Sequence, residues 1–148
     1  MSTRVRSEWA DYARGVLDRA GHHKARARDA LIELLAGETC ALTALEIEDR
    51  LREDGQRVAR ASIYRILELL GEHGLVARLE LGDGTTRYEL IDPGGEHHHH
   101  LLCDSCGRVV PFDDRDLERA IEHLARRLEF RTDDHEVVLH GACSACQD

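Results

Sequence analysis

Apolar residues in the first half of the chain recur three or four positions apart, the spacing of an amphipathic helix. The pattern predicts four helices, at residues 6–20, 24–36, 43–55 and 61–73. Glycines at the ends of these segments are typical helix stops. Thr43 followed by Glu46 is a capping box that opens the third helix. In the fourth helix, Ile63, Ile66, Leu67 and Leu70 form the expected buried stripe, so its other residues are left for solvent or a partner.

Two short strands follow the fourth helix, at residues 75–81 and 85–91. Gly82-Asp83-Gly84 joins them as a hairpin turn, in which glycine accepts a positive φ. The helices followed by this hairpin favour a winged helix-turn-helix DNA-binding domain. The Pro/Gly-rich stretch from Asp92 to Gly95 then predicts a boundary, with domains at 1–92 and 93–148.

The second half of the chain predicts a small sheet and one long helix. The strands are expected at residues 97–103, 109–112 and 136–140, and the helix at 114–129. Leu117, Ile121 and Leu124 lie on one side of that helix. The expected fold class is therefore α+β, with a winged helix-turn-helix domain followed by an α/β domain.

Composition and charge modify this interpretation in two ways. No apolar run among the 148 residues approaches the length of about 20 that spans a bilayer, and residues 1–19 are charged throughout. We therefore expect a cytoplasmic protein without membrane contact. The net charge of −9 opposes DNA binding in general, but the acidic excess follows Pro93. A DNA-binding face would therefore be a local cluster of arginines.

Five cysteines in a chain expected to be cytoplasmic favour metal or redox chemistry over disulfides. Four of them form two CxxC pairs, Cys103/Cys106 and Cys143/Cys146. Two such turns supply four thiolates, the tetrahedral set that structural zinc prefers. The alternative is that one pair is a redox dithiol. No organic cofactor is expected.

The run His97-His98-His99-His100 leads directly into an apolar strand. Alternation along a strand would turn His97 and His99 to one face and His98 and His100 to the other. The run could thus serve two separate metal sites. Glu118 and His135 are candidates to complete the first site, and Glu89 is a candidate for the second. A solvated glutamate or a packed histidine is the alternative at each of these three positions.

Taken in order, these motifs resemble the ferric uptake regulator family of bacterial metalloregulators. The resemblance spans about Gly21 to Cys146. It rests on Arg28, Ala61-Ser62-Ile63-Tyr64-Arg65-Ile66-Leu67, Gly74-Leu75-Val76, Arg87-Tyr88-Glu89-Leu90, His97 to Cys106 and Gly141 to Cys146. It implies a homodimer joined by the second domain. It also implies structural zinc on Cys103, Cys106, Cys143 and Cys146, a dimer-domain site on His97, His99, Glu118 and His135, and a regulatory hinge site.

For the hinge site, the resemblance implies Glu89, His98 and His100 together with two further ligands. At those two positions this sequence has Ala41, where a histidine is usual, and Pro111, where an acidic residue is usual. Cys40 adjoins the first of them. A site of Cys40, Glu89, His98 and His100 would have mixed S, N and O ligands, which favour zinc. The alternative role for Cys40 is that of a small buried apolar residue.

The expected function is metal-dependent repression of metal-uptake genes through double-stranded operator DNA. Zinc is favoured as the regulatory metal because the four-histidine run resembles zinc-responsive members, and ferrous iron is the alternative because Glu89 resembles iron-responsive ones. The candidate DNA contacts are Arg57, Arg60, Ser62, Tyr64, Arg65 and Arg28. A metallohydrolase and a metal-storage or chaperone protein are the rival functions. Neither of them explains the helix that carries Tyr64 and Arg65, and we expect no enzymatic activity.

Overall fold

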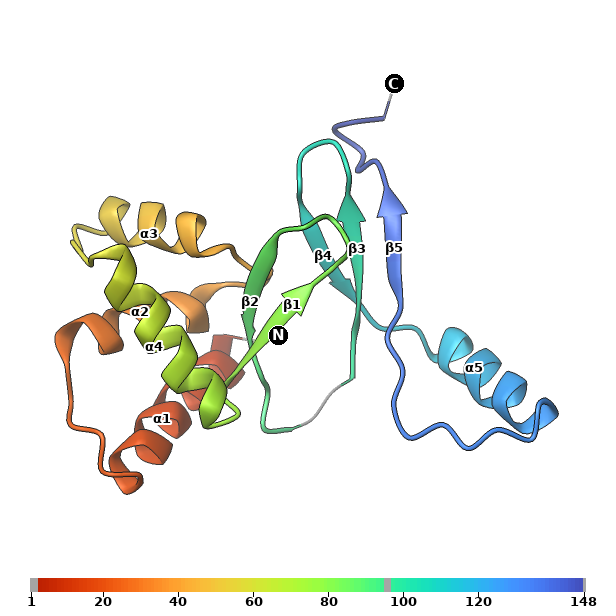
Figure 1. Ribbon diagram of the computed structural model, residues 1–148, viewed down its shortest axis with the longest axis horizontal. Helices are drawn as coiled ribbons and strands as arrows, with labels where there is room; N and C mark the ends of the chain where they lie inside the picture. The colour runs from red at the N-terminus through yellow and green to blue at the C-terminus, as the bar shows by residue number, and fades with distance from the viewer. Residues whose placement is uncertain (1–2, 95–96, 148) are drawn as a thin grey trace. The chain divides into compact units, whose positions relative to one another are not determined.

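The computed structural model describes residues 3–94 and 97–147, which divide into two compact units, Met1–Glu96 and His97–Asp148 (Figure 1). The first unit contains α1 (Thr3–Arg19), α2 (Arg26–Gly37), α3 (Ala44–Glu53), α4 (Arg60–Glu72), β1 (Val76–Glu80) and β2 (Thr86–Leu90). The second contains β3 (His99–Cys103), β4 (Val109–Phe112), α5 (Arg115–Arg127) and β5 (Val138–Gly141). Among the described residues, no helix is long and apolar enough to cross a membrane.

The core of the first unit lies between its four helices. Trp9 and Leu17 of α1 are almost fully buried against apolar residues of the other three helices. The further members include Leu31, Ile32, Leu35, Ile47, Leu51, Ile63, Leu67, Leu70 and Leu75. The predicted stripe of α4 is thus the face that meets the core, with Ile66 only partly buried, because apolar residues at helical spacing leave water together.

A bridge between Leu42 and Tyr88 attaches the segment before α3 to the β1–β2 hairpin. Leu42 donates its N–H to the Tyr88 carbonyl at 2.9 Å, and the Tyr88 N–H donates to the Leu42 carbonyl at 2.7 Å. The hairpin itself is antiparallel, with Val76 opposite Leu90. The buried Arg87 of β2 donates to both carboxylate oxygens of Asp83 in the hairpin turn, at 3.0 and 2.8 Å. The bridge thus holds the hairpin to the segment before α3, and the Arg87–Asp83 bonds stabilise the hairpin itself.

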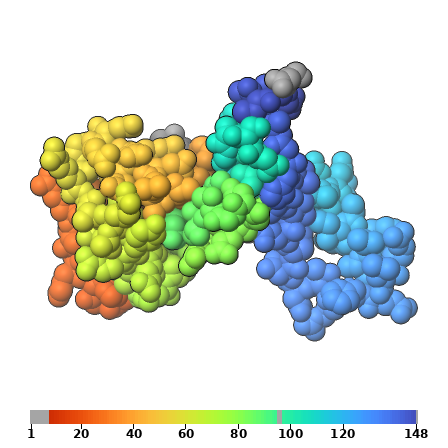
Figure 2. Space-filling view, turned by 45° about the horizontal axis from the view of Figure 1, so that its top comes forward, coloured from red at the N-terminus to blue at the C-terminus, as the bar shows by residue number. Residues whose placement is uncertain are grey.

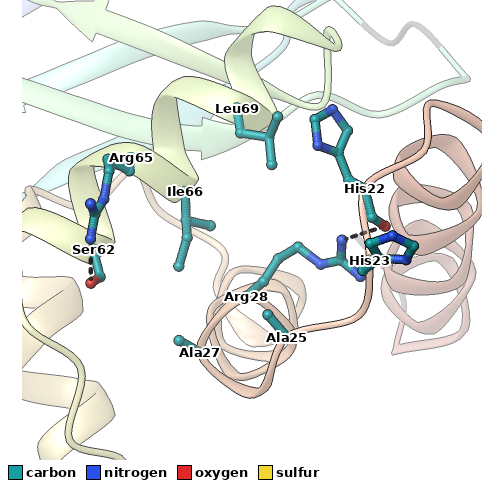
Figure 3. A pocket seen from close by; sticks show the side chains of 9 residues that line it. All are labelled: His22, His23, Ala25, Ala27, Arg28, Ser62, Arg65, Ile66 and Leu69. Atoms are coloured by element: carbon teal, nitrogen blue, oxygen red, sulfur yellow. Dashed lines mark hydrogen bonds between the residues drawn. The ribbon is translucent and has the colours of Figure 1, made fainter.

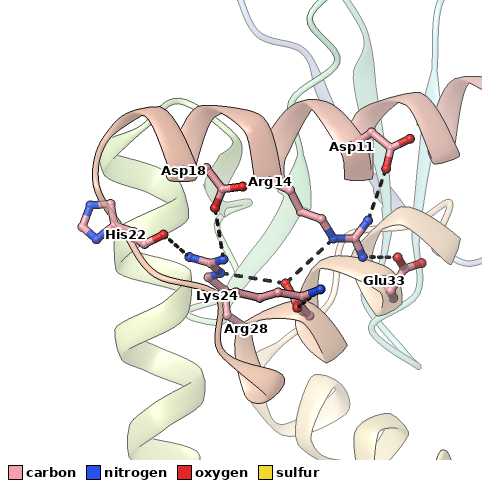
Figure 4. A network of polar contacts seen from close by, with 8 residues as sticks. Asp11, Arg14, Asp18, His22, Lys24, Arg28 and Glu33 are labelled. Atoms are coloured by element: carbon pink, nitrogen blue, oxygen red, sulfur yellow. Dashed lines mark hydrogen bonds and ion pairs between the residues drawn. The ribbon is translucent and has the colours of Figure 1, made fainter.

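A polar network ties α1 to α2 along the surface of the first unit (Figure 4). Arg14 of α1 contacts Asp29 at 3.8 Å and forms an ion pair with Glu33 of α2. Arg28, also on α2, is only 4% exposed and donates to the carbonyl oxygen of His22 at 3.0 Å. Exposed ion pairs contribute little stability, whereas a buried guanidinium needs its acceptor. Arg28 is therefore the member of this network that fixes the turn after α1.

In the second unit, β3 lies between β4 and β5, antiparallel to β4 and parallel to β5. The predicted strand start at His97 is wrong, since β3 begins at His99. The physical reason is that β4 ends at Phe112, opposite His99, so the pairing with β4 begins there. The strand predicted at 136–140 is Val138–Gly141, because pairing with β3 starts at His100 and Val138. The helix predicted from residue 6 begins earlier, at Thr3.

Every residue of α5 is at least partly exposed, although the helix is strongly amphipathic. Leu124, Leu128 and Phe130 have exposed fractions of 45%, 64% and 71%. In the space-filling view, α5 and the chain after it, in light blue, form an open lobe beside β5 (Figure 2). Leu101 and its strand neighbour Leu139 are also exposed. The second unit thus carries apolar surface that its own residues leave uncovered.

The capping box of α3 gives a test of this local structure. Thr43 Oγ1 accepts from the Glu46 N–H at 3.2 Å, and Glu46 Oε2 accepts from the Thr43 N–H at 2.8 Å. We expect Thr43→Ala to lower the free energy of unfolding by about 1 kcal/mol, because one helix N–H loses its acceptor. Urea denaturation at fixed zinc content measures this. Thr43→Ser keeps the acceptor and should lose much less, and equal losses in both variants would contradict the capping explanation.

Candidate functional site

The two CxxC pairs meet at one end of the three-stranded sheet. Cys103 ends β3 and lies opposite Gly141, the last residue of β5, so each pair follows one of two parallel neighbouring strands. Both pairs form a similar tight turn: Gly107 donates its N–H to the Cys103 carbonyl at 2.8 Å, and the equivalent Gln147 donates to the Cys143 carbonyl at 3.0 Å. Gly107 has a φ of 74°, which glycine adopts without strain.

The four sulfurs have the spacing of a metal-binding group. All four cysteines are free thiols, and their sulfur atoms lie within 4.8 Å of one another. Cys106 Sγ and Cys143 Sγ are 3.8 Å apart, far beyond a disulfide bond length of about 2.05 Å. Zn–S bonds of about 2.3 Å place two thiolates about 3.8 Å apart in a regular tetrahedron. The sulfur arrangement therefore fits a zinc ion.

The thiols also differ in acidity. The backbone N–H of Cys143 donates to Cys103 Sγ at 3.3 Å, and this bond with others from the first turn lowers the Cys103 pKa to about 6. The hydrogen bonds of Cys146 with Cys143 and the other sulfurs raise the pKa of Cys146 to about 12. Several thiolates in one cluster repel one another, so full deprotonation requires a cation among them.

A second group joins three imidazoles to one carboxylate. Glu118, on the first turn of α5, lies 2.6 Å from His99 Nε2, 2.8 Å from His135 Nε2 and 3.9 Å from His97 Nε2. His99 is fully buried, and the backbone N–H of Val137 donates to its Nδ1 at 3.2 Å, which orients the ring. The hydrogen bond with His99 is the largest of the effects that hold the Glu118 pKa below its ordinary value.

This His/Glu group also has the dimensions of a cation site. Bonds of about 2.0–2.2 Å to nitrogen and oxygen place tetrahedral ligands about 3.3 Å apart. The three distances from the Glu118 carboxylate to the imidazole nitrogens are both shorter and longer than about 3.3 Å. Small side-chain rotations would therefore bring these ligand atoms around an ion. The group links β3, α5 and the segment before β5, and a bound cation would therefore brace the exposed helix.

The face of α4 away from the core carries most of the predicted DNA contacts. Tyr64 is 48% exposed, and the exposed Arg65 donates to Ser62 Oγ at 3.1 Å. Arg60 donates to the Glu48 carboxylate of α3 at 2.7 Å, and this hydrogen bond raises the pKa of Arg60. Arg57 is exposed in the loop before α4.

Arg28 differs from the other predicted DNA contacts because it is buried. It lines a pocket that Ser62 and Arg65 also border (Figure 3). Its part in DNA binding stays a prediction.

Comparisons with known proteins place these features in a family. The model of the ferric uptake regulator family matches residues 19–140. The chain is 37% identical over 114 residues to the ferric uptake regulation protein of Bacillus subtilis, covering 76% of each chain. This chain belongs to the ferric uptake regulator family.

Solved structures of the family share the fold. The Helicobacter pylori ferric uptake regulator matches with a TM-score of 0.82 at 23% identity, covering 97% of this chain and 94% of that one. The Vibrio cholerae ferric uptake regulator matches with a TM-score of 0.74 at 29% identity, covering 86% and 96%. The predicted α+β class, with a winged-helix DNA-binding domain and a dimerisation domain, is confirmed, and the family consists of metal-responsive transcription regulators.

The residues predicted for the hinge site lie in both units. In the second unit, the rings of His98 and His100 have centroids 5.0 Å apart, as expected from their alternation. Pro111, which replaces the usual acidic residue of the family, pairs directly with His100. In the first unit, the Leu42–Tyr88 bridge brings the segment of Cys40 beside that of Glu89. Ligation by these four residues stays a prediction.

Sequence reasoning missed partners that lie far away along the chain. The Val137 N–H that orients His99 and the Glu48 carboxylate that pairs with Arg60 carry no motif. The pair of His22 and His73 was also missed, because 51 positions separate them. Periodicity identifies the face of an element but not its neighbour in space, so no local signal could have found these contacts.

The four-cysteine group predicts the outcome of a metal-removal experiment. We expect the wild-type chain to keep one zinc ion per protomer after dialysis against EDTA, and Cys143→Ser to lose it, since three thiolates bind more weakly than four. Zinc content by mass spectrometry is the measurement. Cys40→Ser is the matched control and should keep its zinc. Equal retention by Cys143→Ser would show that the pairs do not share an ion.

Proposed function

We propose that this chain is a metal-dependent repressor that binds operator DNA as a homodimer, with zinc as the regulatory metal. The observation that carries the proposal is the His97, His99, Glu118 and His135 group, which joins the buried strand β3 to the exposed helix α5. Its donors would hold α5 against the sheet when they share a cation. A bound metal ion would thereby fix the position of α5, and with it the exposed apolar surface that this helix and the sheet share.

The apolar surface supports a second copy of this chain as the partner. Leu124 on α5, Leu128 directly after this helix, and Leu101 and Leu139 on the sheet are exposed within one unit. Apolar surface of this kind leaves water when a partner covers it. A homodimer presents two α4 helices, and paired recognition helices read half-sites about one helical turn apart. The metal-bound dimer would then fix the separation that the operator requires.

The choice of zinc rests on ligand chemistry. Three imidazoles and one carboxylate suit zinc and also ferrous iron, and the relatives named for ferric uptake favour iron. The proposed hinge site of Cys40, Glu89, His98 and His100 adds a thiolate, which favours zinc. The structure of the Vibrio cholerae regulator reveals a rearrangement of its DNA-binding domains. The proposed hinge site would control a rearrangement of the same type in this chain.

Operator binding under defined metal conditions tests the proposal. Fluorescence anisotropy would use a duplex from the upstream region of the protein's own gene, with the EDTA-resistant zinc left in place. We expect tight binding with zinc, and weak binding after chelation, because metal stabilises the DNA-competent state. Glu118→Gln should need more zinc for the same binding, while the control Glu122→Gln on the same helix should behave as wild type.

The other outcomes of that experiment are equally informative. Tight binding with ferrous iron alone would replace zinc by iron as the regulatory metal. Equal binding in the zinc, iron and chelated states would exclude metal control, even though the fold is that of a DNA-binding regulator.

The α4 face generates a separate prediction. We expect Arg65→Ala to weaken operator binding by about 1–3 kcal/mol, roughly fivefold to 150-fold in Kd, because one base or phosphate contact is lost. The control is Arg119→Ala, an equally charged and exposed position on α5, which should change Kd little. Zinc content and thermal unfolding should match wild type in both variants. An unchanged Kd for Arg65→Ala would place the DNA contacts elsewhere.

A further inference from the structure

The first unit contains a pair of histidines that belongs to none of the ligand groups described above. His22 follows α1, and His73 caps the C-terminal end of α4. Their Nε2 atoms are 3.3 Å apart, and the rings meet edge to face, with centroids 5.2 Å apart and planes at 76°. Both side chains are partly buried. Two imidazole nitrogens therefore converge on one point between the ends of α1 and α4.

The backbone holds both residues firmly in this position. The His22 N–H donates to the Leu17 carbonyl at 2.9 Å, and the His22 carbonyl accepts from the buried guanidinium of Arg28. The His73 N–H donates to the Leu69 carbonyl at 3.3 Å, and Gly74 turns the chain away with a φ of 67°. Each ring thus projects from a helix end that is already ordered, so little conformational entropy remains to be lost on ligand binding.

We propose that His22 and His73 form a two-imidazole binding site for a divalent transition metal ion of the zinc class. Zn–N bonds of about 2.0–2.1 Å place two tetrahedral nitrogen ligands about 3.3 Å apart, the observed separation of the Nε2 atoms. Imidazole is a ligand that zinc, copper and nickel share, whereas calcium and magnesium prefer oxygen. The chemistry of the pair therefore selects the class of ion.

Space beside His22 can hold the remaining ligands. His22 borders a pocket of about 360 Å³ that also reaches Arg28 and Leu69 (Figure 3). Water occupies about 30 Å³ per molecule, so the pocket has room for the waters that complete a four-coordinate ion. With two protein ligands, the site is weaker than the four-ligand groups. The ring of His23 lies beside Arg28, turned away from the ring of His22 (Figure 3).

Zinc titration of the full chain tests the site. The four-cysteine group, the His/Glu group and the proposed hinge site are first filled with zinc, and calorimetry then measures any weaker binding. We expect the wild-type chain to bind one further equivalent per protomer. His22→Asn and His73→Asn should each lose it, because a single imidazole is left. His23→Asn, which changes the adjacent exposed histidine, should keep it.

A second measurement distinguishes metal binding from a simple hydrogen bond between the rings. In ¹H–¹⁵N spectra of the imidazoles, the Nε2 signals of His22 and His73 should shift together as the further equivalent binds. Thermal unfolding without added zinc checks that the variants are folded. The proposal is overturned if the two signals stay unchanged, or if all three variants bind the same further equivalent as the wild type.

Discussion

Parallel pairing between β3 and β5 aligns His100 with Val138 and Cys103 with Gly141. At one end of the pair, this register places the two CxxC turns side by side, so that four sulfurs share one small volume. At the other end, it brings the Val137 N–H to His99 and the nearby His135 to Glu118. A shift of one residue would turn every β5 side chain to the opposite face. Both ligand groups therefore depend on the hydrogen bonds of one short strand pair.

The second unit combines strong polar organisation with little apolar packing of its own. Leu102, Cys103 and Val109 are buried, whereas the apolar side of α5 and the Leu101–Leu139 pair are exposed. A domain of this size buries too little surface to be very stable alone and commonly relies on metals or on oligomerisation. The metal ions proposed for the four-cysteine and His/Glu groups, and the proposed second copy of the chain, would together meet this requirement.

The first unit differs from the second because its helices form a continuous apolar core. Ile63, Leu67 and Leu70 anchor α4 from one side, which leaves Tyr64 and Arg65 exposed on a rigid helix. Arg60 is joined to α3 through Glu48, and His73 at the far end meets His22. The exposed face of α4 is thus held at both of its ends by polar contacts with other elements. Such a face presents its side chains with little freedom, which favours specific recognition.

The sequence by itself determined the helices, the hairpin, the CxxC turns and the alternation of the histidines, because each is a local pattern of spacing, capping or turn chemistry. The family followed from the order of those patterns. The tertiary structure decided which distant segments meet: Glu118 with His99 and His135, Glu48 with Arg60, and His22 with His73. It also shortened the strand expected from His97, since strand length is set by the partner, and it buried Arg28, whose exposure depends on the turn after α1. Local propensity fixes an element and its faces, but contacts between elements arise from burial and pairing over long sequence separations, which periodicity does not encode.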